Sequence, residues 1–537
     1  MRRSLNTGSV WRTLRLLQER HLLTVTGADA DRQYNQHAIV QVFYYHGLAR
    51  RQQRAMHRRA AEYYEAEERD LLRAGVHYER AAAYELAARQ ATADVWAIIN
   101  QGQARALRQL LERLRADQLP PAQWAEVTIA RGVNDTFLDE RSRASQHFQQ
   151  ALADLDDLPP SPHVQQLKAK VCLGMAELLE LDTPADALTW LERGLRETAD
   201  LESAESAALQ IKMGTARLYL GRYEAARAAL ENGLAQLAPG PSQLRSAALT
   251  NLGSVHFFQG DLARARQLYE QALAMSQQLH DRLRSVNNLS NLAINKFCQG
   301  HWRDAIVDWQ AALTLAESLG SAKLQAEVTV NLGAAYINTG DDAQAARHLR
   351  RSLQLASAHN LHVIEAFAQL RLADLHIRRA DWSAAAAYLT AAEKVARAIN
   401  HQGSLIAVLR YWAEIKLAQQ DEQAAMTHIQ SSLALAAELA ERMEQGESLR
   451  VLGTVLWRLG QHAQALAAFE ESLQILATED PYQAARTQVL LGTLLLEEAA
   501  STRGEILLQE ATTTFTQLGA QRDLAQLSGG QHDEGSV

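Results

Sequence analysis

The chain of 537 residues has few of the residues that crosslink small folds or interrupt helices. Its two cysteines, Cys172 and Cys298, lie far apart and outside any C-x-x-C pair. A disulfide framework or a thiolate zinc site therefore has no support, and a reducing compartment fits. Only nine prolines and 6% aromatic residues occur beside abundant Ala, Leu, Gln, Glu and Arg. This composition favours helix nearly throughout and argues against a strand-rich fold.

Long apolar runs are also missing. No run approaches the roughly 18 apolar residues of a membrane span, and the N-terminal MRRSLNTGSVW lacks the apolar core of a signal peptide. We therefore expect a cytoplasmic protein without a membrane partner. Residues 1–80 carry 14 Arg against nine Asp and Glu, although the net charge of the chain is −8. Because Arg is favoured over Lys along the whole chain, compositional bias explains this excess better than a nucleic-acid surface does.

Motifs of common catalytic sites are absent as well. Residues 527–531 spell LSGGQ, a signature of ABC-type ATPases, but the chain contains no Gly-Lys pair and hence no G-x-x-x-x-G-K-[ST] phosphate loop. H-E-x-x-H, G-x-S-x-G and EF-hand patterns do not occur, and His359 with His362 form an isolated H-x-x-H. We predict a protein that is not an enzyme and has no cofactor and no metal site.

What the sequence does contain is a repeat of 40 residues. Segments that begin at Asn251, Asn291 and Asn331 align without a gap, and a small residue recurs at one position of each unit. These small residues are Gly132, Gly174, Gly214, Gly253, Ala293, Gly333, Ala373, Ala413, Gly453 and Gly492. A second small residue, such as Ala265, follows twelve positions later in most units, and a bulky one, such as Tyr269, follows after sixteen.

This spacing predicts stacked helical hairpins. Apolar residues recur at helical intervals on both sides of breaks such as Gln259-Gly260-Asp261, where Gly suits a left-handed turn and Asp can cap the next helix. We expect Gly253 to face Ala265 where the two helices cross, and Tyr269 to fill the space between successive hairpins. One hairpin cannot bury its own apolar face, but about ten stacked units can.

The pattern of L-G, aromatic and A-L positions resembles a long form of the tetratricopeptide repeat (TPR). The resemblance covers residues 118–518 and departs from the standard unit because the closing proline is missing. It implies an all-α fold: a right-handed α-solenoid of about ten TPR hairpins, preceded by a small winged-helix-like module. We expect a winged-helix-like module at 1–56, linker hairpins at 57–117, the TPR superhelix at 118–518 and a flexible tail at 519–537.

The N-terminal segment resembles a module of a signalling family. A helix through Leu17, a short strand at residues 22–25 and the sequence YNQHAIVQVFYY resemble the winged helix of STAND-type ATPases such as MalT and related LuxR-type regulators. In many such ATPases a histidine touches the phosphates of bound ADP from this module, which implies that His37 would do so only if an NTPase domain on another chain is present. A structural role for His37 in the wing is the simpler alternative.

Binding residues are expected on the first helices of the hairpins. Two positions before the small residue, Asn251, Asn291 and Asn331 form a ladder that then breaks to Arg371, Tyr411 and Val451. A carboxamide both donates and accepts, so such a row can bind the backbone of an extended peptide. The alternative is that each Asn bonds its own neighbouring hairpin. The expected lining around the ladder includes Asn287, Ser290, Phe257, Phe297, Asn338 and Trp457, with Arg410 and Arg450 available for an acidic group.

The sequence therefore favours a non-catalytic scaffold that binds a protein or peptide in its concave face. The resemblance suggests the sensor or partner-binding arm of a STAND-type signalling or transcription-regulatory system. Two alternatives stay open: a stand-alone peptide-binding TPR adaptor, and a regulator that binds DNA through the N-terminal winged helix.

Overall fold

The chain forms two compact units. The computed structural model describes residues 16–18, 23–26, 33–36, 45–180, 183–199, 204–498 and 502–530. The first unit comprises Met1–Ile98 and Arg105–Arg131, and the second comprises Ile99–Ala104 and Gly132–Val537. The expected start of the repeats at residue 118 stays a prediction, and the first unit extends to Arg131. The reason is that Trp124, Val127 and Ala130 pack into the apolar core of the first unit.

The described part of the first unit contains a β-ribbon followed by short helices. Strand β1 (Leu23–Thr26) pairs antiparallel with β2 (Gln33–Gln36), close to the strand expected at residues 22–25. The helical elements are α3 (Arg50–Tyr63), π-helical η2 (Tyr64–Glu68), α4 (Leu71–Arg80), α5 (Tyr84–Ala93), α6 (Val95–Asn100), α7 (Ala104–Arg113) and 3-10 helical η3 (Ala116–Gln118). Most of residues 1–44, including His37, lie outside the described residues, so the winged helix stays a prediction.

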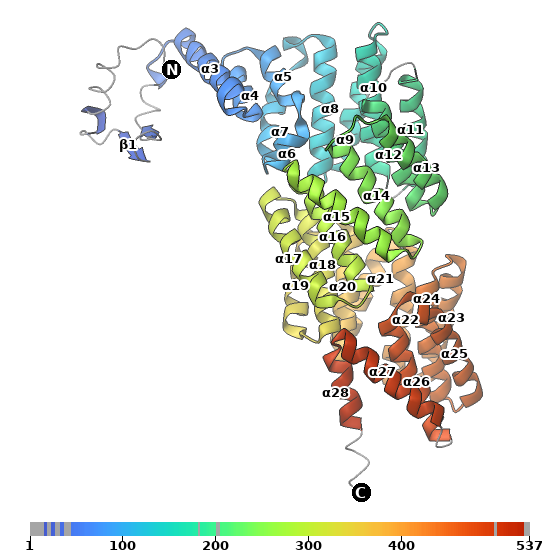
Figure 1. Cartoon of the computed structure of the whole chain (residues 1–537). Coiled ribbons are helices and arrows are strands. Elements are labelled where there is room, and N and C mark those ends of the chain that lie inside the picture. Colours follow the sequence, from blue (N-terminus) through green and yellow to red (C-terminus); the bar gives the residue numbers. More distant parts are fainter. Residues whose placement is uncertain are drawn as a thin grey trace. The chain divides into compact units, whose positions relative to one another are not determined.

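The remaining helices pair consecutively into antiparallel hairpins (Figure 1). Helices α8 (Pro121–Phe137) and α9 (Arg141–Asp156) precede the pairs. The pairs are α10 (Pro162–Leu179) with α11 (Pro184–Glu197), α12 (Ala204–Tyr219) with α13 (Tyr223–Gln236), α14 (Gln243–Phe258) with α15 (Leu262–Gln278), α16 (Arg282–Cys298) with α17 (Trp302–Leu319), α18 (Ala322–Thr339) with α19 (Asp342–Ala358), α20 (His362–Arg378) with α21 (Trp382–Ala398), α22 (Gln402–Ala418) with α23 (Glu422–Glu438), α24 (Arg442–Arg458) with α25 (His462–Glu479), and α26 (Pro481–Glu498) with α27 (Thr502–Leu518). The predicted all-helical solenoid is confirmed.

A left-handed residue ends each helix in the regular part of the solenoid. Such residues recur every twenty positions at Gly260, His280, Gly300, Gly320, Gly340, Asn360, Ala380, Asn400, Gln420, Ala440 and Gly460. Gly260 has a φ of 83°. The next residue, Asp261, accepts a hydrogen bond from the backbone N–H of Arg264 at 3.0 Å and caps α15. Two such steps of helix and turn make one 40-residue unit.

In most units the glycine packs against the bulky residue sixteen positions later, whereas Gly174 packs against Phe148 of the preceding helix. A Cβ on Gly253 would lie 2.7 Å from Cε1 of Tyr269, and Gly453 faces the ring of Phe469 in the same way. The bulky residue therefore fills the crossing within its own hairpin, where we had expected Ala265 to face Gly253. Ala265 is fully buried in a cluster with Tyr269 and Leu292 of the next hairpin.

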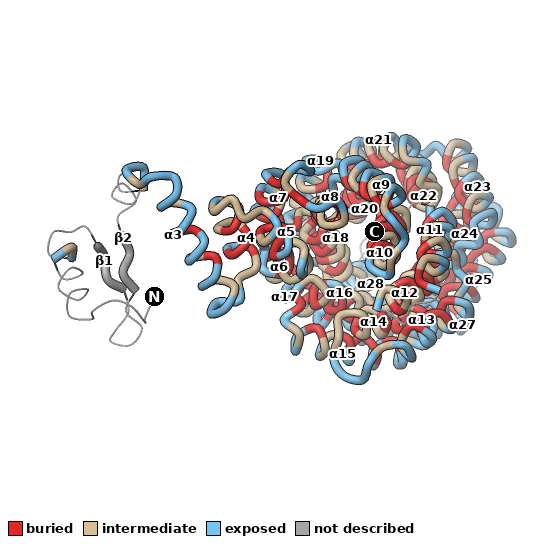
Figure 2. Tube along the Cα trace, turned by 90° about the horizontal axis from the view of Figure 1, so that it is seen from above, coloured by how far each residue is buried: buried red, intermediate tan, exposed pale blue. Residues whose placement is uncertain are grey.

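The first helices of the hairpins form the inner layer of the second unit. Helices α10, α12, α14, α16, α18, α20, α22 and α24 each contact the next first helix, whereas no two second helices of neighbouring hairpins do so to a comparable extent in the described part. In Figure 2, α14, α16, α18 and α20 lie nearer the centre of this unit than α15, α19 and α21. None of the described helices is both long and apolar enough to cross a bilayer.

The end of the chain differs from the expected flexible tail. Residues Gln521–Gly530 form helix α28. Leu524 and Leu527 lie half-buried against a cluster that includes Trp302, Tyr482 and Phe515. The two leucines are three positions apart and give α28 an apolar stripe, so burial of that stripe orders a segment that composition alone made appear unstructured.

Candidate functional site: the inner face of the solenoid

The Asn ladder lies on three neighbouring inner helices. Asn251, Asn291 and Asn331 occupy the same position of α14, α16 and α18 and are each half-buried. Asn251 donates from Nδ2 to Oγ1 of Thr215 on α12 at 2.6 Å. Within the described residues, no protein group hydrogen-bonds the side chains of Asn291 and Asn331. Asn251 therefore bonds a neighbouring hairpin, as the alternative interpretation of the ladder predicted. The carboxamides of Asn291 and Asn331 are available to a ligand.

The other residues expected around the ladder divide into exposed polar groups and packed aromatic groups. Asn287 is exposed, and Ser290 and Asn338 are half-buried on the same helices. Phe257 and Phe297 are half-buried in the apolar clusters of their hairpins.

Trp457 also takes part in internal contacts. Its Nε1 donates to Oε2 of Glu497 at 3.1 Å, and its ring meets Phe469 edge-on at 6.5 Å between centroids. Glu497 lies 40 residues further along, at the equivalent place of the next unit. The indole therefore links two hairpins, and its binding role stays a prediction.

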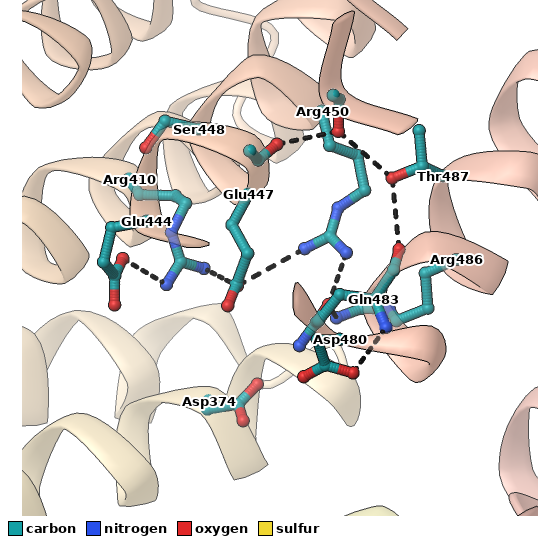
Figure 3. A network of polar contacts seen from close by, with 12 residues as sticks. Asp374, Arg410, Glu444, Glu447, Ser448, Arg450, Asp480, Gln483, Arg486 and Thr487 are labelled. Atoms are coloured by element: carbon teal, nitrogen blue, oxygen red, sulfur yellow. Dashed lines mark hydrogen bonds and ion pairs between the residues drawn. The ribbon is translucent and has the colours of Figure 1, made fainter. Parts of the chain in front are cut away.

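Arg410 and Arg450 lie in a buried polar network (Figure 3). Both side chains are only 3% exposed. Arg410 contacts Glu444 at 3.1 Å and Glu447 at 2.8 Å, whereas Arg450 is 3.7 Å from Glu447 and donates to Oε1 of Gln483. Each guanidinium group already has partners on a neighbouring inner helix, so an acidic ligand would have to compete for it.

Burial and the neighbouring arginines shift the pKa values of the carboxyl groups of this network in opposite directions. Burial raises the pKa of Glu447, but Arg410 and Arg450 outweigh it, so the pKa is lowered overall. For Glu444 burial prevails over Arg410, and the pKa is raised. Arg410 is closer to Glu447 than to Glu444, in keeping with the lower pKa of Glu447. Burial and the neighbouring Arg486 lower the pKa of Arg450 to about 10.

Sequence reasoning missed several polar groups of the inner face. Arg371 is exposed at the ladder position 40 residues after Asn331 and has no ion-pair partner among the described residues. Lys212 on α12 lies 3.0 Å from Glu180 and 4.0 Å from Glu177, and joins α10 to α12. Tyr219, at the end of α12, is 48% exposed. The 40-residue register alone could have identified Arg371, since the ladder offset marks its helix face.

The repeat units match a known family. The tetratricopeptide repeat profile matches residues 205–278, 244–318 and 404–478. These segments are tetratricopeptide repeats. They include hairpins α12–α17 and α22–α25, and therefore Asn251, Asn291, Arg410 and Arg450. Asn331 lies between the matched TPR segments in the same register.

Solved structures share the TPR architecture. A Rap protein complexed with competence and sporulation factor is 14% identical, with a TM-score of 0.51 over 68% of this chain and 100% of that chain. The apo form of RapI is 11% identical, with a TM-score of 0.46 over 66% and 97%. A STAND protein with a TPR sensor from Pyrococcus horikoshii is 14% identical, with a TM-score of 0.44 over 71% and 57%. At these identities the likeness concerns the fold alone.

A comparison with curated protein sequences gives no match. No group of three or more His, Cys, Asp or Glu side chains in the described part of the chain is arranged to hold a metal ion.

Proposed function

We propose that the protein is a non-catalytic TPR scaffold that binds an extended protein or peptide segment along the inner face of α14, α16 and α18. The observation that carries this proposal is the pair of carboxamides of Asn291 and Asn331, which lie in one register on neighbouring inner helices and have no hydrogen-bond partner in the part of the chain that the structure describes. A half-buried carboxamide that is not used in folding retains its full capacity to donate and accept hydrogen bonds.

The chemistry of the inner face suits recognition of a main chain. Each Asn offers one acceptor and two donors, so it can pair with both the C=O and the N–H of a peptide unit independently of the ligand's side chains. Asn287 and Asn338 add polar groups beside the ladder, and Arg371 ends it with an exposed cation. An acidic residue or a terminal carboxylate of the ligand would pair with Arg371.

The wider setting that we propose is the sensor or partner-binding arm of a STAND-type signalling or transcription-regulatory system in the cytoplasm. The support comes from the sequence resemblance of residues 5–56 and 57–117 to the modules that precede the repeats in that family. In this setting an NTPase domain on another chain would be a partner. Affinity capture of the full chain from its host followed by mass spectrometry tests this setting: recovery of an NTPase supports it, and recovery of other proteins alone favours a stand-alone adaptor.

A display selection with a library of twelve-residue peptides tests the binding site itself. We expect selected peptides to bind the wild-type chain and to lose at least about ten-fold in affinity for the variant Asn291→Ala/Asn331→Ala, because two hydrogen bonds of roughly 1 kcal/mol each are removed. The melting temperature of this variant should stay unchanged, since neither side chain bonds the protein.

Asn251→Ala is the matched control. It removes the bond to Thr215 and should lower the melting temperature, while its effect on affinity should be smaller than that of the double variant. Unchanged affinity in the double variant would place the ligand elsewhere.

A further inference from the structure

The last helices of the chain contact hairpins that precede them by about 180 residues in sequence. The ring of Tyr482, at the start of α26, meets the ring of Trp302 edge-on at 5.1 Å between centroids. The Tyr482 hydroxyl accepts from Nη1 of Arg378 at 2.7 Å and donates to Oδ2 of Asp523 on α28 at 3.0 Å. One side chain thus joins the hairpin α16–α17, the end of α20 and helix α28.

Helices α27 and α28 each add a further contact to the earlier hairpins. Arg522 forms an ion pair with Asp342 at the start of α19. Leu518, at the end of α27, packs on Gly300 so closely that a Cβ at this glycine would overlap it. Figure 1 shows α27 and α28 next to the lower ends of α18 and α19. We call these contacts the clasp: Gly300, Trp302, Asp342 and Arg378 on one side, and Tyr482, Leu518 and Arg522 on the other.

The clasp is small compared with the interfaces between neighbouring hairpins. Its apolar cluster consists mainly of residues from the C-terminal helices themselves, namely Tyr482, Ala485, Ala511, Phe515 and Ala520. From the earlier hairpins only Trp302 and the half-buried Phe297 belong to it. Neighbouring hairpins, in contrast, pack along whole helices. Since local opening starts where little apolar surface is buried, the clasp is the first interface of the second unit that should open.

We propose that the clasp is a releasable closure that switches the second unit between a closed and an open form. It ties together the ends of three successive inner helices, α16, α18 and α20, which carry Asn291, Asn331 and Arg371. In the closed form, the C-terminal helices α26, α27 and α28 hold the ends of these three inner helices at a fixed spacing. When the clasp opens, the only constraint on this spacing is the contact between neighbouring hairpins, and α28 leaves its seat. This inference does not depend on the identity of any ligand.

Two glycine variants of the full chain provide a matched test. Gly300 and Gly260 occupy equivalent turns with φ of 80° and 83°, but only Gly300 faces the clasp, because nothing lies within 4 Å of a Cβ at Gly260. Both Gly300→Ala and Gly260→Ala introduce the same backbone strain. Only Gly300→Ala pushes Leu518 away.

Hydrogen–deuterium exchange measured by mass spectrometry separates the two forms. In Gly300→Ala we expect the amides of α28 and of the turns at residues 299–302 and 340–342 to exchange at least ten-fold faster than in Gly260→Ala, and the radius of gyration from X-ray scattering to increase. Helices α22–α24 should keep their protection in both variants.

Arg522→Glu supplies a second variant that needs no change in a turn. It places a carboxylate beside Asp342 and should produce the same exchange pattern as Gly300→Ala. Equal exchange of α28 and both turns in Gly300→Ala and Gly260→Ala, or wild-type exchange in Arg522→Glu, would overturn the proposal. If Gly300→Ala does not fold, Arg522→Glu decides the outcome by itself.

Discussion

At the scale of single residues, the surroundings of a glycine decide what its replacement does. Gly333 lies inside α18, where a Cβ would clash with the side chain of Leu349. Gly403 lies in α22, where the nearest atom to a Cβ is Cε1 of His401 at 3.6 Å, an ordinary contact. The same substitution should therefore have opposite effects at the two sites.

We expect Gly333→Ala to destabilise the second unit by about 1 to 3 kcal/mol through overpacking. Gly403→Ala should stabilise it by roughly 0.5 to 1 kcal/mol, because Ala has the higher helix propensity. Urea unfolding followed by circular dichroism measures both. If Gly333→Ala stabilised the protein, the crossing of α18 and α19 would have space for a Cβ, which would contradict the account.

Asp374 gives the protein a pH-dependent contribution to stability. Although burial raises the pKa of this carboxyl, Arg378 at 2.9 Å, together with Arg371 and Arg486, lowers it below the ordinary value. The folded protein thus releases this proton more readily than the unfolded chain. The resulting stabilisation is fully present above a pH of about 3.9 and is lost as the pH falls through the lower pKa of the folded state.

Asp374→Asn should therefore cost about 3 kcal/mol at pH 7, because it leaves Arg378, whose side chain is only 10% exposed, without its carboxylate. The difference from wild type should shrink below a pH of about 3.9. Urea unfolding at pH 7, 5 and 3.5 tests the sign. Asp117→Asn, at an exposed pair with Arg115, is the control and should follow the wild type at each pH. A difference that grows on acidification would contradict the assignment.

Residue roles were the least predictable part of the site. The 40-residue register placed Asn251, Asn291 and Asn331 on one face correctly, because an offset within a repeat fixes the direction of a side chain. It could not show that Asn251 bonds Thr215 while the other two carboxamides have no protein partner. Nor could it show that Arg410 and Arg450 are buried, because Glu444, Glu447 and Gln483 come from neighbouring helices and their approach depends on how the helices pack.

At the scale of helices and turns, a turn every twenty residues requires a residue in the left-handed conformation. This conformation costs conformational free energy where the residue is not glycine. Glycine occupies the left-handed turn position at Gly260, Gly300, Gly320, Gly340 and Gly460, but Ala440 takes the same backbone conformation with a φ of 56°. A Cβ makes this conformation unfavourable by about 1 kcal/mol. The turn between α23 and α24 is therefore strained relative to the turns that carry glycine.

Ala440→Gly should relieve this strain and stabilise the protein by roughly 0.5 to 1 kcal/mol, less the entropy that glycine adds to the unfolded chain. The exposed Ala434, in the middle of α23, is the matched control: Ala434→Gly should destabilise by about 0.5 to 1 kcal/mol. Thermal unfolding of the two variants gives the signs. Two destabilising results would mean that the turn carries no strain.

The sequence predicts these elements well within the repeats and less well at the ends. Small residues and Gly-Asp breaks determine helix and turn locally, so α14–α19 could be placed from the alignment of three units. Helix α28 could not, because the order of residues 521–530 depends on packing of Leu524 and Leu527 near Trp302, more than 200 positions away. The boundary at Arg131 likewise depends on the tertiary packing of Trp124.

At the scale of the second unit, the first helices make the inner face and polar pairs connect them. Lys212 joins α10 to α12, Asn251 joins α12 to α14, and Arg410 joins α22 to α24. On α16 and α18 the corresponding carboxamides, Asn291 and Asn331, have no hydrogen-bond partner among the described residues. These polar groups of the inner face are therefore left over from folding, and our account rests on the claim that an extended polypeptide occupies this stretch.

Hydrogen–deuterium exchange of the full chain, with and without a peptide from the display selection, tests this claim most directly. We predict that the peptide slows exchange in α16 and α18 and leaves the outer helices α15, α17 and α19 unchanged. Protection confined to outer helices or to the first unit, with α16 and α18 unaffected, would contradict it.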